Sequence, residues 1–233
     1  MEFAGFQKVT LLDYPERTAC TAFTAGCNFR CPFCHNAEIA FSGKNAPEYC
    51  FSGEEILDYL SGRKGKLDGI CITGGEPLLH KEVIDFAKQA HDRGFLVKID
   101  TNGSVFDRLK YIIENGLCDY VAMDIKNTPE KYPLSAGCEI DIGNVKKSVE
   151  LLKQGKVEYE FRTTVVKELN KKEDFAEIAG WLQGARLYCL QKFKDSERVP
   201  EHGFTAYTDG EMREIKEILL AHGLKNVILR GTD

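Results

Sequence analysis

Short runs of apolar and β-branched residues alternate with longer amphipathic stretches along most of the chain. Six of the short runs are typical of strands, and they cover residues 18–25, 69–73, 95–100, 119–125, 157–166 and 186–193. The amphipathic stretches predict helices over residues 53–61, 81–93, 105–115, 143–154, 171–183 and 209–222. A last apolar run at 226–230 predicts one more strand. The pattern therefore predicts an α/β fold built from six strand–helix units.

Local signals at the predicted helix ends support this division. A glycine, which tolerates the left-handed backbone conformation that closes a helix, follows five of the helices: Gly94, Gly116, Gly155, Gly184 and Gly223. Two helices begin with the capping-box pattern, at Ser52–Glu55 and at Thr208–Glu211. Strands joined by helices through short links are parallel neighbours. We therefore expect either an open doubly wound sheet or a barrel, with six units rather than the eight of a full barrel.

No linker, low-complexity stretch or block of charge divides the sequence. We therefore expect a single domain over residues 1–233, with its six-unit core at 18–193. Residues 194–233 add a loop, a helix and a short strand. The loop at 194–207 is the longest irregular stretch late in the chain, and we expect it to act as a lid or as a contact for a partner.

Composition narrows the setting of the protein. The chain has 233 residues, of which 43% are hydrophobic and 29% are charged, with a formal net charge of −5. It has no apolar run long enough to span a membrane, and its mild acidic excess gives no reason to expect nucleic-acid binding. Nine cysteines, an odd number without a secretion signal, argue against a disulfide framework. We expect a cytoplasmic protein.

Three cysteines near the N-terminus, Cys27, Cys31 and Cys34, have the spacing C-x3-C-x2-C. Three thiolates can bind three irons of a 4Fe–4S cluster and leave the fourth iron open, whereas a closed electron-transfer cluster takes four cysteines. Zinc held by these cysteines and His35 is an alternative, although no second pair of ligands lies close by. The run from Cys31 to His35 also matches the C-x-x-C-H attachment string of c-type haem. The spacing favours the iron–sulfur cluster and leaves both alternatives open.

Polar residues gather where the predicted strands end. They follow the second to the sixth strand in turn and comprise the Thr73–Pro77 run TGGEP, then Asp100, Thr101 and Asn102, then Asp124 and Lys126, then Arg162, Thr163 and Thr164, and last Gln191 and Lys192. Ligands of parallel α/β folds bind at the carboxyl ends of the strands, and strand interiors in such folds are near-continuously apolar. The set offers oxygens for hydroxyls or a cation, and cationic groups for a carboxylate. It suits a zwitterionic ligand that carries a ribose.

The cysteine motif, with Phe33 before its last cysteine and GGEP at residues 74–77, resembles the pattern of radical S-adenosylmethionine (SAM) enzymes. More narrowly, "TAFTAGCNFRCPFCHN", "DTNG", "DYVAMDIK" and "EFRTTVV" are similar to the longer form of the anaerobic ribonucleoside-triphosphate reductase activating proteins. These are glycyl-radical-enzyme activases, similar in turn to pyruvate formate-lyase activating enzyme. The resemblance covers nearly the whole chain and implies a partial (β/α)6 TIM-type barrel with parallel strands.

The resemblance also implies roles for individual residues. A 4Fe–4S cluster would be held by Cys27, Cys31 and Cys34, and its open iron would bind the amino and carboxylate groups of SAM. The residues that would lie around SAM are Phe33, His35, Gly74, Gly75, Glu76, Asp100, Lys126 and Arg162. A monovalent cation near the cofactor would be held by Asp100, Thr101 and Asp124.

The activity that the resemblance implies is that of an anaerobic oxidoreductase. It would cleave SAM reductively to a 5′-deoxyadenosyl radical, which takes a hydrogen atom from a glycine of a partner enzyme. The implied partners are a glycyl-radical enzyme, with anaerobic ribonucleotide reductase as the first candidate, and a one-electron donor such as a flavodoxin or ferredoxin. Two alternatives stay open: a radical SAM enzyme that acts on a small molecule or nucleoside, and a non-enzymatic iron–sulfur or zinc binding module.

Overall fold

The predicted strands form one continuous sheet. The computed structural model describes residues 1–42 and 50–232. Its main sheet has the strand order β10-β9-β8-β7-β6-β5-β3-β2, and only the pair β2 and β3 is antiparallel. The parallel strands are β3 (Ala19–Thr24), β5 (Gly69–Gly74), β6 (Leu96–Thr101), β7 (Tyr120–Asp124), β8 (Glu158–Val165), β9 (Tyr188–Lys192) and β10 (Val227–Arg230). All seven predicted strands are therefore confirmed, each to within two residues.

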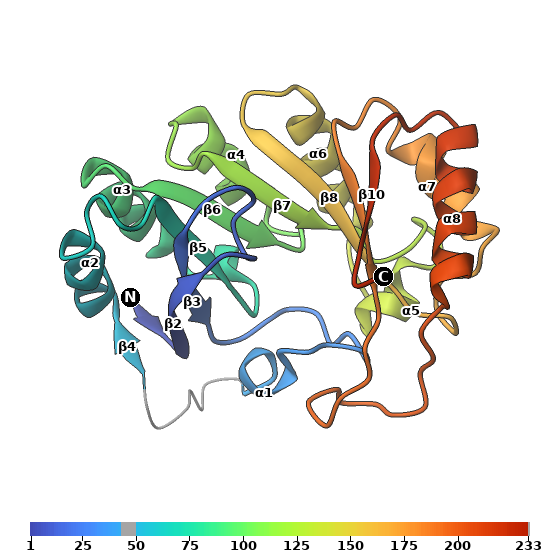
Figure 1. Cartoon of the computed structure of the whole chain (residues 1–233), viewed down its shortest axis with the longest axis horizontal. Helices are drawn as coiled ribbons and strands as arrows, with labels where there is room; N and C mark the ends of the chain where they lie inside the picture. The colour runs from blue at the N-terminus through green and yellow to red at the C-terminus, as the bar shows by residue number, and fades with distance from the viewer. Residues whose placement is uncertain (43–49, 233) are drawn as a thin grey trace.

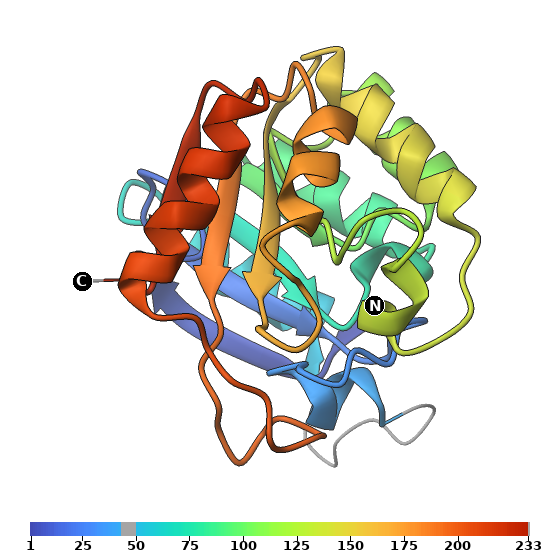
Figure 2. The ribbon, with the colours of Figure 1, turned by 90° about the vertical axis from the view of Figure 1, so that its right-hand side faces the viewer.

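The predicted helices are confirmed as well. They are α2 (Gly53–Ser61), α3 (Val83–Asp92), α4 (Phe106–Glu114), α6 (Ile142–Lys153), α7 (Asp174–Trp181) and α8 (Asp209–Ala221). They lie along the outer face of a curved sheet, whereas a doubly wound fold would carry helices on both faces (Figure 1, Figure 2). The fold is thus a partial barrel, with β2 and β10 at the two edges of the sheet. Within the described ranges, no helix is long and apolar enough to cross a membrane.

Several short elements were not predicted. Strand β2 (Gly5–Thr10) extends the sheet beside β3, and β1 (Glu2–Phe3) pairs with β4 (Phe51–Ser52). The middle of β2 is exposed on both faces, so its sequence lacks the alternation that marks a half-buried strand. Helices α1 (Ala37–Ala40) and α5 (Tyr132–Ala136) are one turn long and lie in the loops after β3 and β7.

The strands alternate between an apolar outer face and a polar inner face. On β5 and β6, Ile72 and Ile99 belong to the hydrophobic cluster that includes Phe86 of α3. Lys98 and Glu160 lie in the middle of β6 and β8, yet each is only 1% exposed. The expectation of near-continuously apolar strand interiors is therefore wrong for this barrel. Its inside is charged well below the strand ends, and only the face toward the helices is apolar.

Helix α8 begins with a complete capping box. The Thr208 hydroxyl accepts a hydrogen bond from the Glu211 amide at 3.3 Å, and the Glu211 carboxylate accepts one from the Thr208 amide at 2.8 Å. We expect Thr208→Ala to lower the free energy of unfolding by about 1 kcal/mol, because an amide at the helix start loses its acceptor. Thr208→Ser keeps the hydroxyl and should retain most of the stability. Urea unfolding of the three proteins checks this, and equal losses in both variants would contradict it.

Candidate active site

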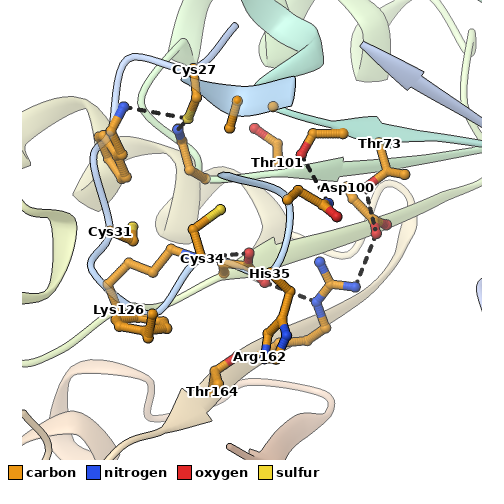
Figure 3. Close-up of a pocket in the computed structure, with 18 of the residues that line it drawn as sticks. Cys27, Cys31, Cys34, His35, Thr73, Asp100, Thr101, Lys126, Arg162 and Thr164 are labelled. Carbon is orange, nitrogen blue, oxygen red and sulfur yellow. Dashed lines mark hydrogen bonds and ion pairs between the residues drawn. The ribbon is translucent and has the colours of Figure 1, made fainter. Parts of the chain in front are cut away.

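A cavity of about 460 Å³ opens at the carboxyl ends of the parallel strands (Figure 3). Its walls come from the loop after β3 and from the ends of β5 to β9. The predicted site residues that line it are Cys27, Cys31, Phe33, Cys34, His35, Gly74, Gly75, Asp100, Thr101, Asp124, Lys126 and Arg162. Residues from distant parts of the sequence thus meet in one pocket, of a size suited to a small-molecule ligand.

The cysteines lie on the loop between β3 and α1, which we call the cysteine loop (residues 25–36). The loop is shaped by its own hydrogen bonds: the Phe29 amide donates to Cys27 Sγ at 3.3 Å and the Cys34 amide to the Cys31 carbonyl at 3.1 Å. Burial raises the pKa of Cys27 to about 12 and that of Cys31 to about 11. The unliganded thiols are therefore protonated at neutral pH, and metal binding has to release their protons.

Two glycines allow neighbouring segments to press against the cysteine loop. A Cβ atom at Gly75 would lie 1.9 Å from the Gly26 carbonyl oxygen, and one at Gly137 would lie 2.0 Å from the Arg30 carbonyl oxygen. The Arg30 amide also donates to the Ala136 carbonyl at 2.8 Å. The backbone of the loop is thus held from two sides where only a residue without a side chain fits.

Glu76 lies behind the cavity wall rather than in its lining. Its carboxylate is fully buried and accepts hydrogen bonds from the Leu78 amide at 3.0 Å, the Thr101 hydroxyl at 2.8 Å and the Asn102 amide at 2.7 Å. Burial raises the pKa of Glu76 to about 7, although these hydrogen bonds oppose the shift. The side chain therefore ties the GGEP turn to the end of β6, which is a structural task that the GGEP motif does not reveal.

Three adjacent strands bring alternating charges to the cavity. Arg162 donates from Nε to Asp124 Oδ1 at 2.9 Å and from Nη1 to Asp100 Oδ2 at 3.1 Å. Lys126 Nζ donates to Asp124 Oδ2 at 3.0 Å. Burial by itself would raise the pKa of Asp124, but the Arg162 and Lys126 cations lower it to about 2. Burial would likewise raise the pKa of Asp100, but Arg162 and Lys98 lower it. Both carboxylates are therefore ionised, and the guanidinium bridges them. Figure 3 shows Arg162 beside Asp100.

Phe33 and His35 of the cysteine loop contact other parts of the cavity rim. Lys126 Nζ lies 5.9 Å from the centre of the Phe33 ring, within the range of a cation–π contact. The His35 ring packs against Phe193, with the ring centres 5.9 Å apart. The segment at 194–207 then continues from Phe193, and the Glu201 amide donates to the Pro32 carbonyl at 3.1 Å. This segment therefore contacts the cysteine loop directly, and its role as a lid or partner contact stays a prediction.

The cavity lining includes residues to which the sequence gave no role toward SAM or a metal. Asp13 comes from the loop after β2 and accepts a hydrogen bond from the Thr21 hydroxyl at 2.5 Å. Asn102 donates to Asn28 Oδ1 at 3.0 Å and to Cys27 Sγ at 3.8 Å. Asn102 was predicted among the polar strand ends, through its place in the DTNG run, but it was given no role toward a cofactor or metal. Asp13 carried no such signal, because β2 itself was not predicted.

The donor set fits a 4Fe–4S cluster. Cys27, Cys31 and Cys34 are free thiols on one wall, and no other cysteine lines the cavity as far as the chain is described. Over the same described ranges, no three His, Cys, Asp or Glu side chains converge closely enough to hold a single metal ion. Three separate thiols can each take one iron of a cluster and leave the fourth iron for a ligand.

Comparison with known proteins gives the family. A model of the radical SAM superfamily matches residues 21–182. The chain is 34% identical to a protein of Methanocaldococcus jannaschii named "Putative glycyl-radical enzyme activating enzyme", over 97% of this chain and 95% of that one. The chain therefore belongs to the radical SAM superfamily, and it is similar over its whole length to this activating enzyme. The resemblance seen in the motifs is confirmed.

Other relatives match about half of the chain. A pyruvate formate-lyase-activating enzyme of Clostridium pasteurianum is 32% identical over 46% of this chain and 45% of its own length. A 7-carboxy-7-deazaguanine synthase of Thermoplasma acidophilum is 31% identical over 43% of each chain. Membership of the superfamily implies a 4Fe–4S cluster and SAM as cofactors. It therefore favours the iron–sulfur interpretation of the three cysteines over zinc and haem.

Solved structures support the fold. A radical SAM methyltransferase from Sphaerobacter thermophilus has a TM-score of 0.71 at 16% identity, covering 95% of this chain and 68% of that chain. A domain of a pyruvate-formate lyase-activating enzyme from Bacteroides vulgatus has a TM-score of 0.57 at 18% identity, covering 70% of this chain and 99% of that domain. At these identities the likeness concerns the partial barrel and not the reaction.

The packing of the cysteine loop leads to a test with a matched control. Gly137 and Gly155 both have left-handed backbones, with φ of +67° and +69°, but only Gly137 has backbone atoms where a Cβ would go. An alanine at either position costs about 1 kcal/mol for the left-handed conformation. We expect Gly137→Ala also to displace Arg30 and Cys31, and so to lose most of the iron bound after anaerobic reconstitution. Gly155→Ala should bind iron like the wild type, and equal iron content in the two variants would contradict the role of Gly137.

Proposed function

We propose that this protein is a radical SAM activase that installs a glycyl radical in a partner enzyme, with an anaerobic ribonucleoside-triphosphate reductase as the first candidate. The observation that carries the proposal is the 34% identity over 97% of the chain with a protein named as an activating enzyme of glycyl-radical enzymes. The similarity to the deazaguanine synthase, in contrast, covers 43% of the chain. A whole-length match includes the loops around the cavity, which decide what substrate can enter.

The cysteine loop and the charged wall have separate roles in the proposal. Cys27, Cys31 and Cys34 would hold the 4Fe–4S cluster, and the Phe33 backbone would meet the adenine of SAM. When bound, the cluster and SAM would supply the radical chemistry, in which one electron cleaves SAM to methionine and 5′-deoxyadenosine and a hydrogen atom is removed from the target glycine. Such chemistry belongs to the cofactors, so the protein has to position them and exclude competing reactants.

The part of the cavity lining that lies outside the cysteine loop suits a zwitterion. Gly74 and Gly75 present backbone to the cavity without side chains, and they would face the methionine amine. Lys126 and Arg162 supply cationic groups for the methionine carboxylate. The aromatic side chains of Phe23, Phe29 and Phe33 line the same cavity and limit the access of water to it. Each feature binds, orients or shields, and none requires an acid–base pair.

A second candidate function keeps the cofactors and changes the acceptor. A radical SAM enzyme that acts on a small molecule or nucleoside is favoured by the partial identity to 7-carboxy-7-deazaguanine synthases and by 30% identity to a "Probable GTP 3′,8-cyclase" of Thermococcus kodakarensis over 68% of the chain. A flavodoxin or ferredoxin as electron donor and a cytoplasmic location stay predictions under either function.

Reductive cleavage of SAM is the first step to test. The protein is reconstituted anaerobically with iron and sulfide, reduced, and incubated with SAM. We expect 5′-deoxyadenosine to form, measured by liquid chromatography, and to fall to background in the variant Cys27→Ala, Cys31→Ala, Cys34→Ala, because that variant has no ligands for the cluster. Cys50 is not part of the cavity lining, so the variant Cys50→Ala should keep the activity and serves as the control. Production of 5′-deoxyadenosine at the same level in the triple variant would reject the proposed site.

The identity of the acceptor needs a separate test. The active protein is incubated with SAM, a reductant and a candidate anaerobic ribonucleotide reductase, and electron paramagnetic resonance is recorded. We expect a doublet from a glycyl radical, which disappears when the target glycine of the reductase is changed to alanine. SAM cleavage without a doublet for any glycyl-radical enzyme tried, together with turnover of a nucleoside, would favour the second candidate function.

A further inference from the structure

Lys98 is a fully buried lysine inside the barrel, one layer below the cavity. It is 1% exposed, and its Nζ forms an ion pair with Asp100 Oδ1 and lies 3.6 Å from Cys71 Sγ. Lys98 and Asp100 are two residues apart on β6, so both side chains point to the inner face. A buried ammonium is costly unless it is paired. The ion pair with Asp100 therefore ties this charge to the floor of the proposed SAM site.

The oxygens of Asp100 already have protein partners. Besides Lys98, which pairs with Oδ1, Arg162 donates to Oδ2 at 3.1 Å and the Thr73 hydroxyl donates to Oδ2 at 3.3 Å. Asp100 is one of the three residues that resemblance to the activases assigns to a monovalent cation. A cation bound there would have to displace Lys98 or lie beside it with no free carboxylate oxygen to neutralise it.

The other two assigned ligands also have protein partners. Asp124 Oδ1 accepts from Arg162 and Oδ2 accepts from Lys126. The Thr101 hydroxyl donates to Glu76 and accepts from the Gly103 amide at 3.1 Å. Hydrogen bonds and ion pairs thus connect two carboxylates, Asp100 and Asp124, with three cations, Lys98, Arg162 and Lys126. Among these five groups the cations outnumber the carboxylates, so Lys126 and Arg162 can face an anionic group of a ligand.

We propose that Lys98 is a built-in counter-cation which replaces the monovalent cation, so that this protein binds SAM independently of sodium or potassium. Lys98 is a positioning residue, because it acts through Asp100 and does not line the cavity. Lys98 neutralises part of the negative charge of Asp100, so Asp100 neutralises less of the positive charge of Arg162. The two ion pairs of Arg162 use Nε and Nη1, which leaves Nη2 for the methionine carboxylate. The inference rests on the proposed binding of SAM, and not on which molecule receives the radical.

Two variants separate this role from simple packing. Lys98→Ala removes the ammonium and leaves a space next to Asp100 that a hydrated cation can enter. Lys98→Met removes the ammonium but fills the space with an apolar chain. Lys88→Ala is the control, because Lys88 forms an exposed pair with Asp92 at 2.5 Å on α3. The affinity of the reconstituted proteins for SAM is measured by calorimetry in sodium, potassium or tetramethylammonium chloride at equal ionic strength.

We expect the wild type and Lys88→Ala to bind SAM equally in the three salts. Lys98→Ala should bind about tenfold more weakly in tetramethylammonium chloride, a coupling of ordinary size, and recover in sodium or potassium chloride. Lys98→Met should stay weak in all three. Equal losses in both Lys98 variants without recovery by small cations would show a structural role only and overturn the proposal. So would wild-type affinity that rises with sodium or potassium.

A readout without SAM keeps the inference separate from the proposed function. In ²³Na nuclear magnetic resonance, broadening of the sodium line by Lys98→Ala, but not by the wild type or Lys98→Met, would support the replacement of a cation by Lys98. Broadening by the wild type, or by none of the three proteins, would overturn it. Failure of the wild type to bind SAM in any salt would instead reject the proposed function, while the sodium measurement still decides the role of Lys98.

Discussion

The candidate site depends on one electrostatic constraint, the bridge that Arg162 forms between Asp100 and Asp124. The three residues come from adjacent parallel strands, and the register of β7 and β8 places Asp124 directly opposite Arg162. Both carboxylates are partly buried, and either would be destabilised without a partner, so the strand ends cannot shift independently. The bridge also explains why Asp124 stays ionised, with its pKa lowered to about 2 despite burial. A change of register by one residue would turn these charges into the apolar layer under the helices.

The cysteine loop is positioned by contacts of a different kind. Its backbone is confined by Gly75 on one side and Gly137 on the other, and Glu76 holds the turn that carries Gly75 to the end of β6. The segment after β9 adds a hydrogen bond to Pro32. Three segments that are distant in the sequence therefore hold the cysteine loop, which has little regular structure of its own. Such support is what a metal site requires if its ligands are to be preorganised.

The charged wall and the cysteine loop together describe a site in which the protein contributes geometry and the cofactors contribute chemistry. The range matched by the superfamily model, residues 21–182, contains most of the residues that face the cavity, among them Cys27, Gly74 and Arg162. In the layer below, Lys98 forms an ion pair with Asp100, and we propose that this pair adjusts the electrostatics of the site without changing its lining. The glycyl-radical partner we propose would approach from the open carboxyl ends of the strands, where the segment at 194–207 also lies.

The sequence by itself determined the strand–helix alternation, the three cysteines and the polar strand ends, because periodicity and motif spacing are local properties that any short window of the chain displays. It could not determine that the Glu76 carboxylate points away from the cavity toward β6, that Asp13 lines the cavity, or that Lys98 forms an ion pair with Asp100. Each of these depends on a partner from another strand or loop. Pairing across strands is decided by register and by the cost of burying an unpaired charge. Only the tertiary structure brings those partners together, and it thereby converts a set of motifs into one charged site.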